Sequence, residues 1–514
     1  MRKALIGLAL ACGAAGPIAA QAMPGMAEEH HDHAAPERLG TVRFPTSCKP
    51  AVAAQFNRAV ALLHSFAYGA SEKAFAGVAA ADPGCAMAQW GMAMTHYHQL
   101  WEIPIGDALH AGAAASRRVS EIGGGTPREK RYIAAIATYY ADADTVSAAD
   151  RARRYADAMG EVARADPQDD EAQIFYALAL VATAPPSDRS HANQKKAAAI
   201  LEPIYRRQPQ HPGLAHYLIH AYDSAELAPR GLAAARAYAK IAPDAPHALH
   251  MPSHIFTRLG LWDDSIASNL NARAAARAEG DAGEELHAMD YLVYAYLQRA
   301  RYDEAARVAG DVATMPGLRA GLFKVGYAAT AMPVRVAVER HDWAAAAAIQ
   351  PLPGITPNVA AIVYWARALG HSRAAVPGSA DSDIDGLRGC VAALRAQGDT
   401  YWATQADVML REVTAWRAAA AGDGAGAIAG LRAAADEEET LEKLPVTPGP
   451  IVPAREQLGE MLLQLGRPAE ALAAFKASLA AAPGRRGSLI GGIAAAEKVG
   501  DAQAAAAFRG AVGR

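Results

Sequence analysis

The chain has 514 residues, a formal net charge of −3 and a hydrophobic fraction of 52%. Phe, Trp and Tyr make up only 7% of it, so alanine supplies much of the apolar content, which favours tightly packed helices over sheet. The near-neutral charge argues against a nucleic-acid partner. After the N-terminus, no stretch has the roughly 20 uninterrupted apolar residues of a transmembrane segment.

The N-terminus has the pattern of an export signal. Arg2 and Lys3 precede an apolar run that extends to about Ala15, and Ala20-Gln21-Ala22 offers a small-x-small cleavage site. Residues 1–22 are therefore predicted to be a signal peptide, which makes the mature chain an exported protein, soluble and periplasmic in a Gram-negative bacterium. Residues 23–45 are expected to be a flexible tail whose Met and His side chains either hold copper or zinc loosely or form a solvated linker.

Two cysteines near the start of the mature chain are candidates for a disulfide. Cys48 and Cys85 lie near the beginnings of two consecutive predicted helical hairpins, and an exported chain meets an oxidising environment. A bridge between them would stabilise the fold by about 4 kcal/mol in the chain-entropy model. The alternative is a pair of buried free thiols. Cys390 is expected to be a buried thiol in either case.

A repeat with a period near 34 residues extends from about Ala51 to the C-terminus. Equivalent residues 34 positions apart include Pro209 and Pro243, Gly466 and Gly500, and His64 and His98. The stretch Leu463-Gln464-Leu465-Gly466-Arg467-Pro468-Ala469-Glu470-Ala471, followed by Phe475 and Pro483, resembles the tetratricopeptide repeat (TPR). Similar copies begin at Arg258 and at Arg301.

The resemblance implies an all-α fold, a right-handed superhelical solenoid of TPR-like hairpins in which the first helix of each pair, helix A, lines a concave groove. It divides the mature chain into three regions. Residues 46–319 are expected to be a TPR-like solenoid with a histidine-rich groove. Residues 320–450 fit the pattern least and are expected to be irregular helical repeats, and residues 451–514 to be C-terminal TPR hairpins.

Histidines and acids recur at fixed helical phase in three successive repeats. Seven of the 17 histidines fall between His211 and His287. The three sets are His216, His220 and Asp223 at i, i+4 and i+7; His247, His250 and His254 at i, i+3 and i+7; and His287, Asp290 and Tyr294 at i, i+3 and i+7. Those spacings place each set on one face of a helix. In the TPR register, all three sets fall at groove-facing positions of helix A.

The arrangement suits a transition metal, because a His-x-x-x-His pair on a helix aims two nitrogens at one point. Two such pairs lie on adjacent predicted helices, namely His216 with His220 and His250 with His254. Imidazole and carboxylate together suit zinc, copper or iron. Further candidate ligands, which could instead orient the ligands or act as a general base, are Asp223, His247, His287 and Asp290.

Pro252 lies between His250 and His254, inside an expected helix A. It removes a backbone donor and disfavours helical geometry at Met251. The helix is therefore predicted to kink or restart at this point.

Six further residues are predicted to line the groove and contact its ligand. They are His64, Tyr97, His98, Arg258, Tyr294 and Glu456. Glu456 opens a helix after the proline-rich connector at 445–450, and it either faces the histidines across the groove or joins a solvated ion-pair network.

Two functions remain open at this stage. The chain is either an exported binding module that holds a peptide, a protein or a small molecule in its groove, or a metalloenzyme, hydrolytic or oxidative, with the ion held by the A helices of the central repeats. Structural histidines without a ligand are the third interpretation. No nucleophile elbow, phosphate loop, dinucleotide fingerprint or His-Glu-x-x-His motif is present, so whether the chain is an enzyme stays open.

Overall fold

The computed structural model describes residues 37–100, 103–374 and 380–512. The predicted signal peptide (1–22) and the tail as far as residue 36 lie outside the described residues. Residues Arg38–Arg514 form one compact unit. The predicted boundaries at residues 319 and 450, within that unit, stay predictions.

Every regular element among the described residues is a helix. The N-terminal elements are η1 (Pro50–Val52), α1 (Ala53–His64), α2 (Tyr68–Ala81), α3 (Ala86–Thr95), α4 (Gly106–Ile122), α5 (Pro127–Tyr140), α6 (Ala148–Ala165), α7 (Asp170–Ala182), α8 (Ala192–Arg207), α9 (Pro212–Tyr222), α10 (Ala228–Ile241), α11 (Pro246–His250), α12 (Pro252–Arg258) and α13 (Trp262–Glu279). The C-terminal elements are α14 (Ala282–Gln298), α15 (Tyr302–Asp311), η2 (Val312–Thr314), α16 (Phe323–Glu339), α17 (Trp343–Ala348), α18 (Pro357–Arg373), α19 (Ala380–Ala396), α20 (Thr400–Ala420), α21 (Gly424–Glu438), α22 (Ala454–Gln464), α23 (Pro468–Ala481), α24 (Arg486–Val499) and α25 (Ala502–Val512).

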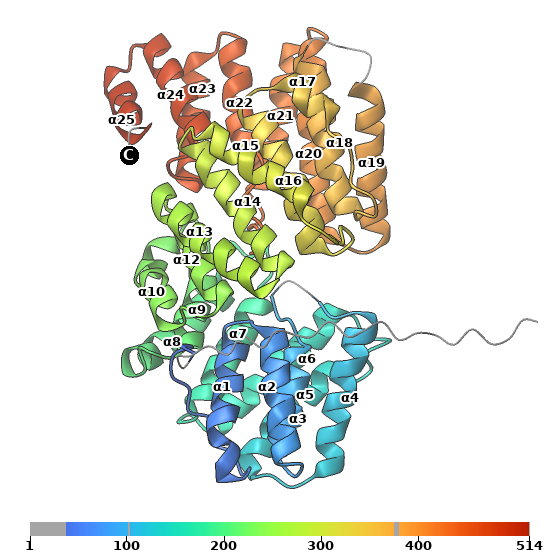
Figure 1. The fold of residues 1–514 in the computed structure, drawn as a ribbon. Coiled ribbons are helices and arrows are strands. Elements are labelled where there is room, and N and C mark those ends of the chain that lie inside the picture. The colour runs from blue at the N-terminus through green and yellow to red at the C-terminus, as the bar shows by residue number, and fades with distance from the viewer. Residues whose placement is uncertain (1–36, 101–102, 375–379, 513–514) are drawn as a thin grey trace, which may run out of the picture. The chain divides into compact units, whose positions relative to one another are not determined.

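Consecutive helices pack as hairpins, and each hairpin packs against the next (Figure 1). The pairs include α1 with α2, α3 with α4, α7 with α8, α9 with α10, α14 with α15, α22 with α23 and α24 with α25. The all-α class and the TPR-like hairpins are therefore confirmed. The histidine sets lie on α9, α11, α12 and α14, each of which is the first helix, or part of the first helix, of its hairpin.

Local sequence explains where these helices begin and turn. Aspartates such as Asp169 and Asp281 cap α7 and α14, because each carboxylate accepts a backbone N–H from the first helical turn. The repeat-period glycines Gly466 and Gly500 end helices with φ of 71° and 76°. That left-handed conformation is accessible to glycine without strain and brings the second helix back against the first.

The helix is divided at Pro252, as predicted. α11 ends at His250 and α12 begins at Pro252. Met251, between them, keeps right-handed helical angles of φ −53° and ψ −35°, so the chain continues in nearly the same direction. His250 and His254 therefore remain close to each other across the break.

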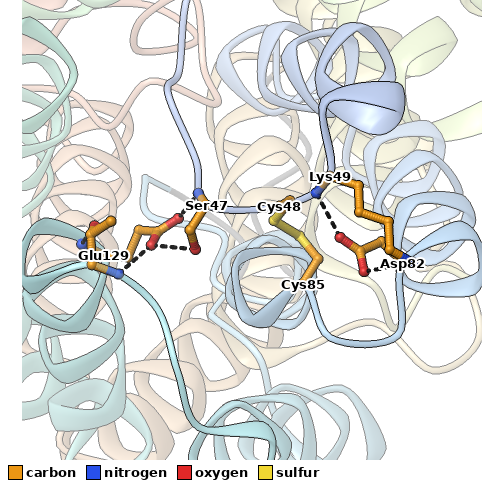
Figure 2. Close-up of a disulfide and its surroundings, with 7 residues drawn as sticks. Ser47, Cys48, Lys49, Asp82, Cys85 and Glu129 are labelled. Carbon is orange, nitrogen blue, oxygen red and sulfur yellow. Dashed lines mark hydrogen bonds and ion pairs between the residues drawn. A yellow bond between two sulfur atoms is a disulfide. The ribbon is translucent and has the colours of Figure 1, made fainter.

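A disulfide joins the loop before α1 to the loop before α3, which confirms the pairing of Cys48 with Cys85 (Figure 2). The backbone N–H groups of the residues on either side of Cys48 are also hydrogen-bonded. The N–H of Lys49 donates to Asp82 at 2.8 Å, and the N–H of Ser47 donates to Glu129 at 2.6 Å. Such a bridge is typical of proteins that fold in an oxidising compartment. Cys390 is buried and free, as expected.

Residues 439–453, here called the crossing segment, connect α21 to α22 and lie against α14 and α16. The Tyr291 hydroxyl is 3.2 Å from the Pro445 carbonyl oxygen and 3.0 Å from that of Thr447. The guanidinium of Arg335 donates to the carbonyls of Gly449 and Pro450 at 3.1 Å each. The proline-rich connector is therefore bound through its backbone to the same α14 that carries His287.

Among the helices that the structure describes, none combines the length and the apolar character that a membrane span requires.

Candidate metal centre

Six buried histidines gather where the first helices of three consecutive hairpins meet. The histidine cluster consists of His216 and His220 from α9, His247 and His250 from α11, His254 from α12 and His287 from α14. Each is at most 5% exposed. α9 packs against α12, and α11 packs against α14, in the green part of the chain in Figure 1.

The cluster divides into two trios, in each of which one nitrogen per ring lies within 4.8 Å of the others. The first trio is His216, His220 and His247, and the second is His250, His254 and His287. The ring centroid of His216 is 4.8 Å from that of His220 and 5.1 Å from that of His247. The centroid of His250 is 4.9 Å from that of His254 and 4.2 Å from that of His287. Each trio thus has the convergent nitrogens that a metal ion requires.

In the second trio, hydrogen bonds at Nδ1 fix the tautomers of two rings. His250 Nδ1 lies 2.6 Å from Oδ1 of Asn269, whose amide orientation is set because its Nδ2 donates to the Ser265 carbonyl at 2.8 Å. His254 Nδ1 lies 2.9 Å from a carboxylate oxygen of Asp223. Both partners are acceptors, so each Nδ1 carries the proton and each Nε2 keeps its lone pair.

Those two Nε2 atoms face each other at 3.0 Å. With both lone pairs pointing inward and neither nitrogen protonated, the contact is repulsive unless a cation lies between or beside them. Two imidazoles bound to one tetrahedral ion at about 2.0–2.1 Å would hold their nitrogens roughly 3.3 Å apart. The observed separation is close to that value.

The first trio has similar support at two of its rings. His216 Nδ1 lies 2.6 Å from the carbonyl oxygen of His64, and His247 Nδ1 lies 3.1 Å from a carboxylate oxygen of Glu284. Both Nε2 atoms therefore keep their lone pairs. His220 Nε2 is 3.1 Å from His216 Nε2. An ordinary N–H···N bond accounts for that contact if His220 donates, so this trio is compatible with an ion without requiring one.

Burial favours the neutral form of five of the six imidazoles, which is the form that binds a metal. At four rings, burial is the main cause of a pKa well below the usual range, and neighbouring imidazoles add to the effect. These four are His216, His220, His250 and His287. Burial also lowers the pKa of His254 to about 4, although the bond to Asp223 opposes the shift. At pH 7 no proton is therefore expected between the Nε2 atoms of His250 and His254.

The carboxylates next to the cluster are themselves ion-paired. Asp223 accepts from Arg258 Nε at 2.8 Å and from Lys443 Nζ, in the crossing segment, at 2.7 Å. Burial alone would raise the pKa of Asp223, but Lys443 and Arg258 hold it well below the usual range. Glu284 accepts from Lys324 Nζ at 2.6 Å. Asp223 and Glu284 are thus ionised acceptors placed to orient His254 and His247.

A third convergent group lies beside the cluster. Glu171 bridges two histidines, with His64 Nε2 3.0 Å from Oε2 and His211 Nε2 3.0 Å from Oε1. His64 Nδ1 lies 2.9 Å from the Tyr217 hydroxyl. All of these groups are buried, and direct hydrogen bonds between them explain the arrangement without an ion. Among the described residues, Nδ1 of His211 is the one nitrogen of this group without a hydrogen-bond partner.

The remaining sequence-predicted residues lie outside the cluster. Tyr97 stacks on Tyr139 at 3.8 Å, and His98 stacks on Tyr68 at 4.0 Å. Asp290 is paired with Arg335 at 2.9 Å rather than directed at a histidine.

Tyr294 and Glu456 meet at one guanidinium. Arg485 donates to the Tyr294 hydroxyl at 3.3 Å and to the two carboxylate oxygens of Glu456 at 2.9 Å each. These buried bonds connect α14 with the C-terminal hairpins. They place Glu456 in an ion pair with Arg485 and not beside the histidines.

Sequence reasoning missed the residues that orient the rings. Asn269, Glu284 and Lys443 come from α13, α14 and the crossing segment, 19, 37 and 220 residues from the groups they bond. A weak signal existed for Glu284, because it precedes His287 by one helical turn. Nothing in the local pattern around Asn269 or Lys443 indicates the role.

Comparisons with known proteins describe the fold only. A scan against protein-family models finds no match for the chain, and a search of curated proteins finds no significant match. Among solved structures, the human IFIT1 dimer with PPP-AAAA is 10% identical with a TM-score of 0.35, over 83% of this chain and 90% of that one. The structure of Naa15/Naa10 bound to HypK-THB is 12% identical with a TM-score of 0.24, over 90% and 68%.

The TPR domain of P58(IPK) is a third similar structure, 13% identical with a TM-score of 0.21, over 81% of this chain and 99% of that one. With TM-scores this low, none of the three bears on the function of this chain. The histidine geometry has to carry that argument alone.

Proposed function

We propose that this chain is an exported TPR-like repeat protein that binds a transition metal, zinc, copper or iron, through buried imidazoles of its central hairpins. The single observation that carries the proposal is the contact between the Nε2 atoms of His250 and His254. Hydrogen bonds on the far side of each ring hold these two lone pairs 3.0 Å apart. In a metal-free protein this arrangement is costly, because a buried polar atom without a partner loses its hydration. An ion next to both nitrogens removes that cost.

Purification of the untagged chain followed by elemental mass spectrometry tests the proposal. We expect near-stoichiometric metal in the wild type and loss of it in the double variant His216→Ala/His250→Ala. The matched control is His98→Ala/His110→Ala, which removes two imidazoles outside the cluster. A metal-free wild-type protein, or a double variant that keeps its metal with an unchanged helical circular dichroism spectrum, would contradict the proposal.

Export is supported by the Cys48–Cys85 disulfide, which persists best in an oxidising compartment, and by the predicted signal at residues 1–22. Cell fractionation with N-terminal sequencing tests it. Export to the periplasm predicts a mature N-terminus at Met23 in the periplasmic fraction, and full-length protein in the cytoplasm would contradict it.

A metalloenzyme is the second candidate function, and the number of ligands favours it. Three imidazoles per ion leave an open coordination position, as in catalytic sites, whereas structural ions are closed by four ligands. The hydroxyl of buried Tyr291 lies 3.5 Å from His254 Nδ1, on the side of the ring opposite Nε2, so it can help to orient this ligand. Turnover of p-nitrophenyl acetate would indicate a hydrolase and dioxygen uptake with catechol an oxidoreductase, and either activity must vanish in His254→Ala while the helical fold remains.

Binding of a peptide, protein or small molecule next to the histidines has less support than metal binding, because Lys443 and the rest of the crossing segment already occupy that place. A cavity of about 660 Å³ lies elsewhere, lined in part by Glu339, His341, Trp343, Arg373, Glu460 and Arg486. A partner of this chain would have that cavity available without displacing the crossing segment.

A further inference from the structure

The two trios adjoin each other, because rings of one trio lie next to rings of the other. The centroid of His220 in the first trio lies 5.9 Å from that of His254 in the second, and the centroid of His247 lies 6.1 Å from that of His250. Ions bound by the two trios would therefore lie on adjoining sets of imidazoles, the kind of arrangement from which a two-metal site is built.

The inward-facing nitrogens are sufficient for two ions. Hydrogen bonds at Nδ1 leave the Nε2 atoms of four rings unprotonated, two in each trio: His216 and His247, and His250 and His254. The third ring of each trio, His220 or His287, has a nitrogen within 4.8 Å of the other two. Each trio can thus offer three imidazoles to its own ion.

The charges around the cluster indicate which oxidation state of a bound metal the site would favour. Arg258 and Lys443 offset the carboxylate of Asp223, and Lys324 offsets that of Glu284. An imidazole that binds a metal does so as a neutral ligand, so six imidazoles bring no negative charge to balance two divalent ions. The cost of burying an ion rises with the square of its charge, which favours a monovalent ion at a site that has no anionic ligand. Among the metals that imidazole binds well, copper is the one with a common monovalent state.

We propose that the two trios together hold a pair of copper ions as one binuclear centre, bound as Cu(I). The proposal rests on the proposed function, metal binding by these histidines, and adds the number of ions, their identity and their proximity. The crossing segment closes the site from the side of Asp223 through Lys443. The pair is therefore enclosed by the chain itself.

The test loads full-length wild-type protein with Cu(I) under anaerobic conditions and counts bound copper by elemental mass spectrometry. Ferricyanide then oxidises each ion by one electron, and the Cu(II) signal is integrated by electron paramagnetic resonance. We expect two copper ions per chain and an integrated signal far below two spins, because neighbouring Cu(II) ions couple. His220→Gln and His254→Gln, which each disable one trio, should bind one copper with a full one-spin signal, and the exposed control His110→Gln should behave as wild type.

The outcomes separate the two proposals. One copper per wild-type chain, two coppers with a full two-spin signal, or zinc that copper cannot displace would overturn the binuclear copper centre and leave metal binding intact. A wild-type protein that binds neither copper nor any other transition metal would contradict the proposed function itself. The wild-type stoichiometry and spin count decide the matter even if a variant misfolds.

Discussion

At the residue scale, the hydrogen-bond partner of Nδ1 decides whether Nε2 of the same histidine keeps its lone pair for a metal. Asn269 holds the proton of His250 on Nδ1, and it is itself oriented by the Ser265 carbonyl. Such outer partners of metal-binding histidines fix the tautomer and the ring plane. The basicity of His250 Nε2 toward a metal therefore depends on a residue that never touches the ion.

Asn269→Ala should weaken metal affinity about 10- to 100-fold, because His250 loses the acceptor that selects its tautomer. Competition with a chromophoric chelator measures the change. Asn57→Ala, which removes an amide that accepts from the Phe44 N–H far from the cluster, is the matched control. Equal affinities for the two variants would mean that Asn269 has no part in orienting the ligand.

A second residue-scale prediction concerns Glu460. Burial alone would raise the pKa of its carboxyl, but the bonds to His341 and Arg373 lower it to about 2. Arg373 itself lies between the rings of Trp343 and Trp416, at 4.1 and 3.9 Å. Because the pKa is lower in the folded than in the unfolded chain, the stabilisation is complete above about pH 4.5 and is lost as the pH falls toward 2.

Glu460→Gln should therefore lower the free energy of unfolding by about 2 kcal/mol at pH 6, a value reduced for partial exposure to solvent. The difference from wild type should shrink as the pH falls below about 4. Urea unfolding across the pH range measures it. Glu497→Gln, which breaks an exposed ion pair with Arg509, should cost little at any pH. A constant Glu460→Gln difference from pH 6 to 3 would refute the assigned pKa.

The residue pattern indicated which histidines share a helix face, and six of them lie together in two trios, but it did not indicate their hydrogen-bond partners. The i, i+4 spacing of His216 with His220 and of His250 with His254 is a local property of the helix, and it can be recognised without knowing the fold. Asp223 was predicted as a possible ligand for the same reason. Its partners Arg258 and Lys443, 35 and 220 residues away, depend on tertiary contacts that no local spacing encodes.

At the element scale, the break at Pro252 matters because it divides the helix between two proposed ligands that face each other, His250 and His254. Proline at the first position of α12 costs no hydrogen bond that a helix start would otherwise make. Met251 stays in the right-handed region. The sequence predicted this break because proline acts locally, through its missing N–H. The expected departure of Met251 from helical geometry is not observed.

The Cys48–Cys85 bridge is an element-scale constraint on α1 and α3, the helices at the N-terminal end of the array. The double variant Cys48→Ala/Cys85→Ala should lower the free energy of unfolding by about 4 kcal/mol, because the bridge closes a long loop in the unfolded chain. Denaturant unfolding of the oxidised proteins measures the loss. Cys390→Ala, which removes a buried free thiol, is the control, and an equally small effect of both variants would show that the bridge contributes little.

At the scale of the whole molecule, the histidine cluster belongs to a network that spans distant parts of the chain. Tyr291 and Lys443 connect α14 and Asp223 to the crossing segment, and Arg485 connects Tyr294 on α14 to Glu456 on α22. The 34-residue period predicted the hairpins, because each hairpin is a local unit that packs against its sequence neighbours. It did not predict the crossing segment, whose contacts join residues more than 100 positions apart.

The most direct test of the account is crystallography of the metal-loaded wild-type protein, with diffraction recorded on both sides of the absorption edge of the bound metal. We expect an anomalous peak within about 2.0–2.2 Å of the Nε2 atoms of His250 and His254. A metal-loaded crystal with no peak at these nitrogens, or with the ion bound elsewhere on the chain, would contradict the claim that the buried histidines form the metal centre.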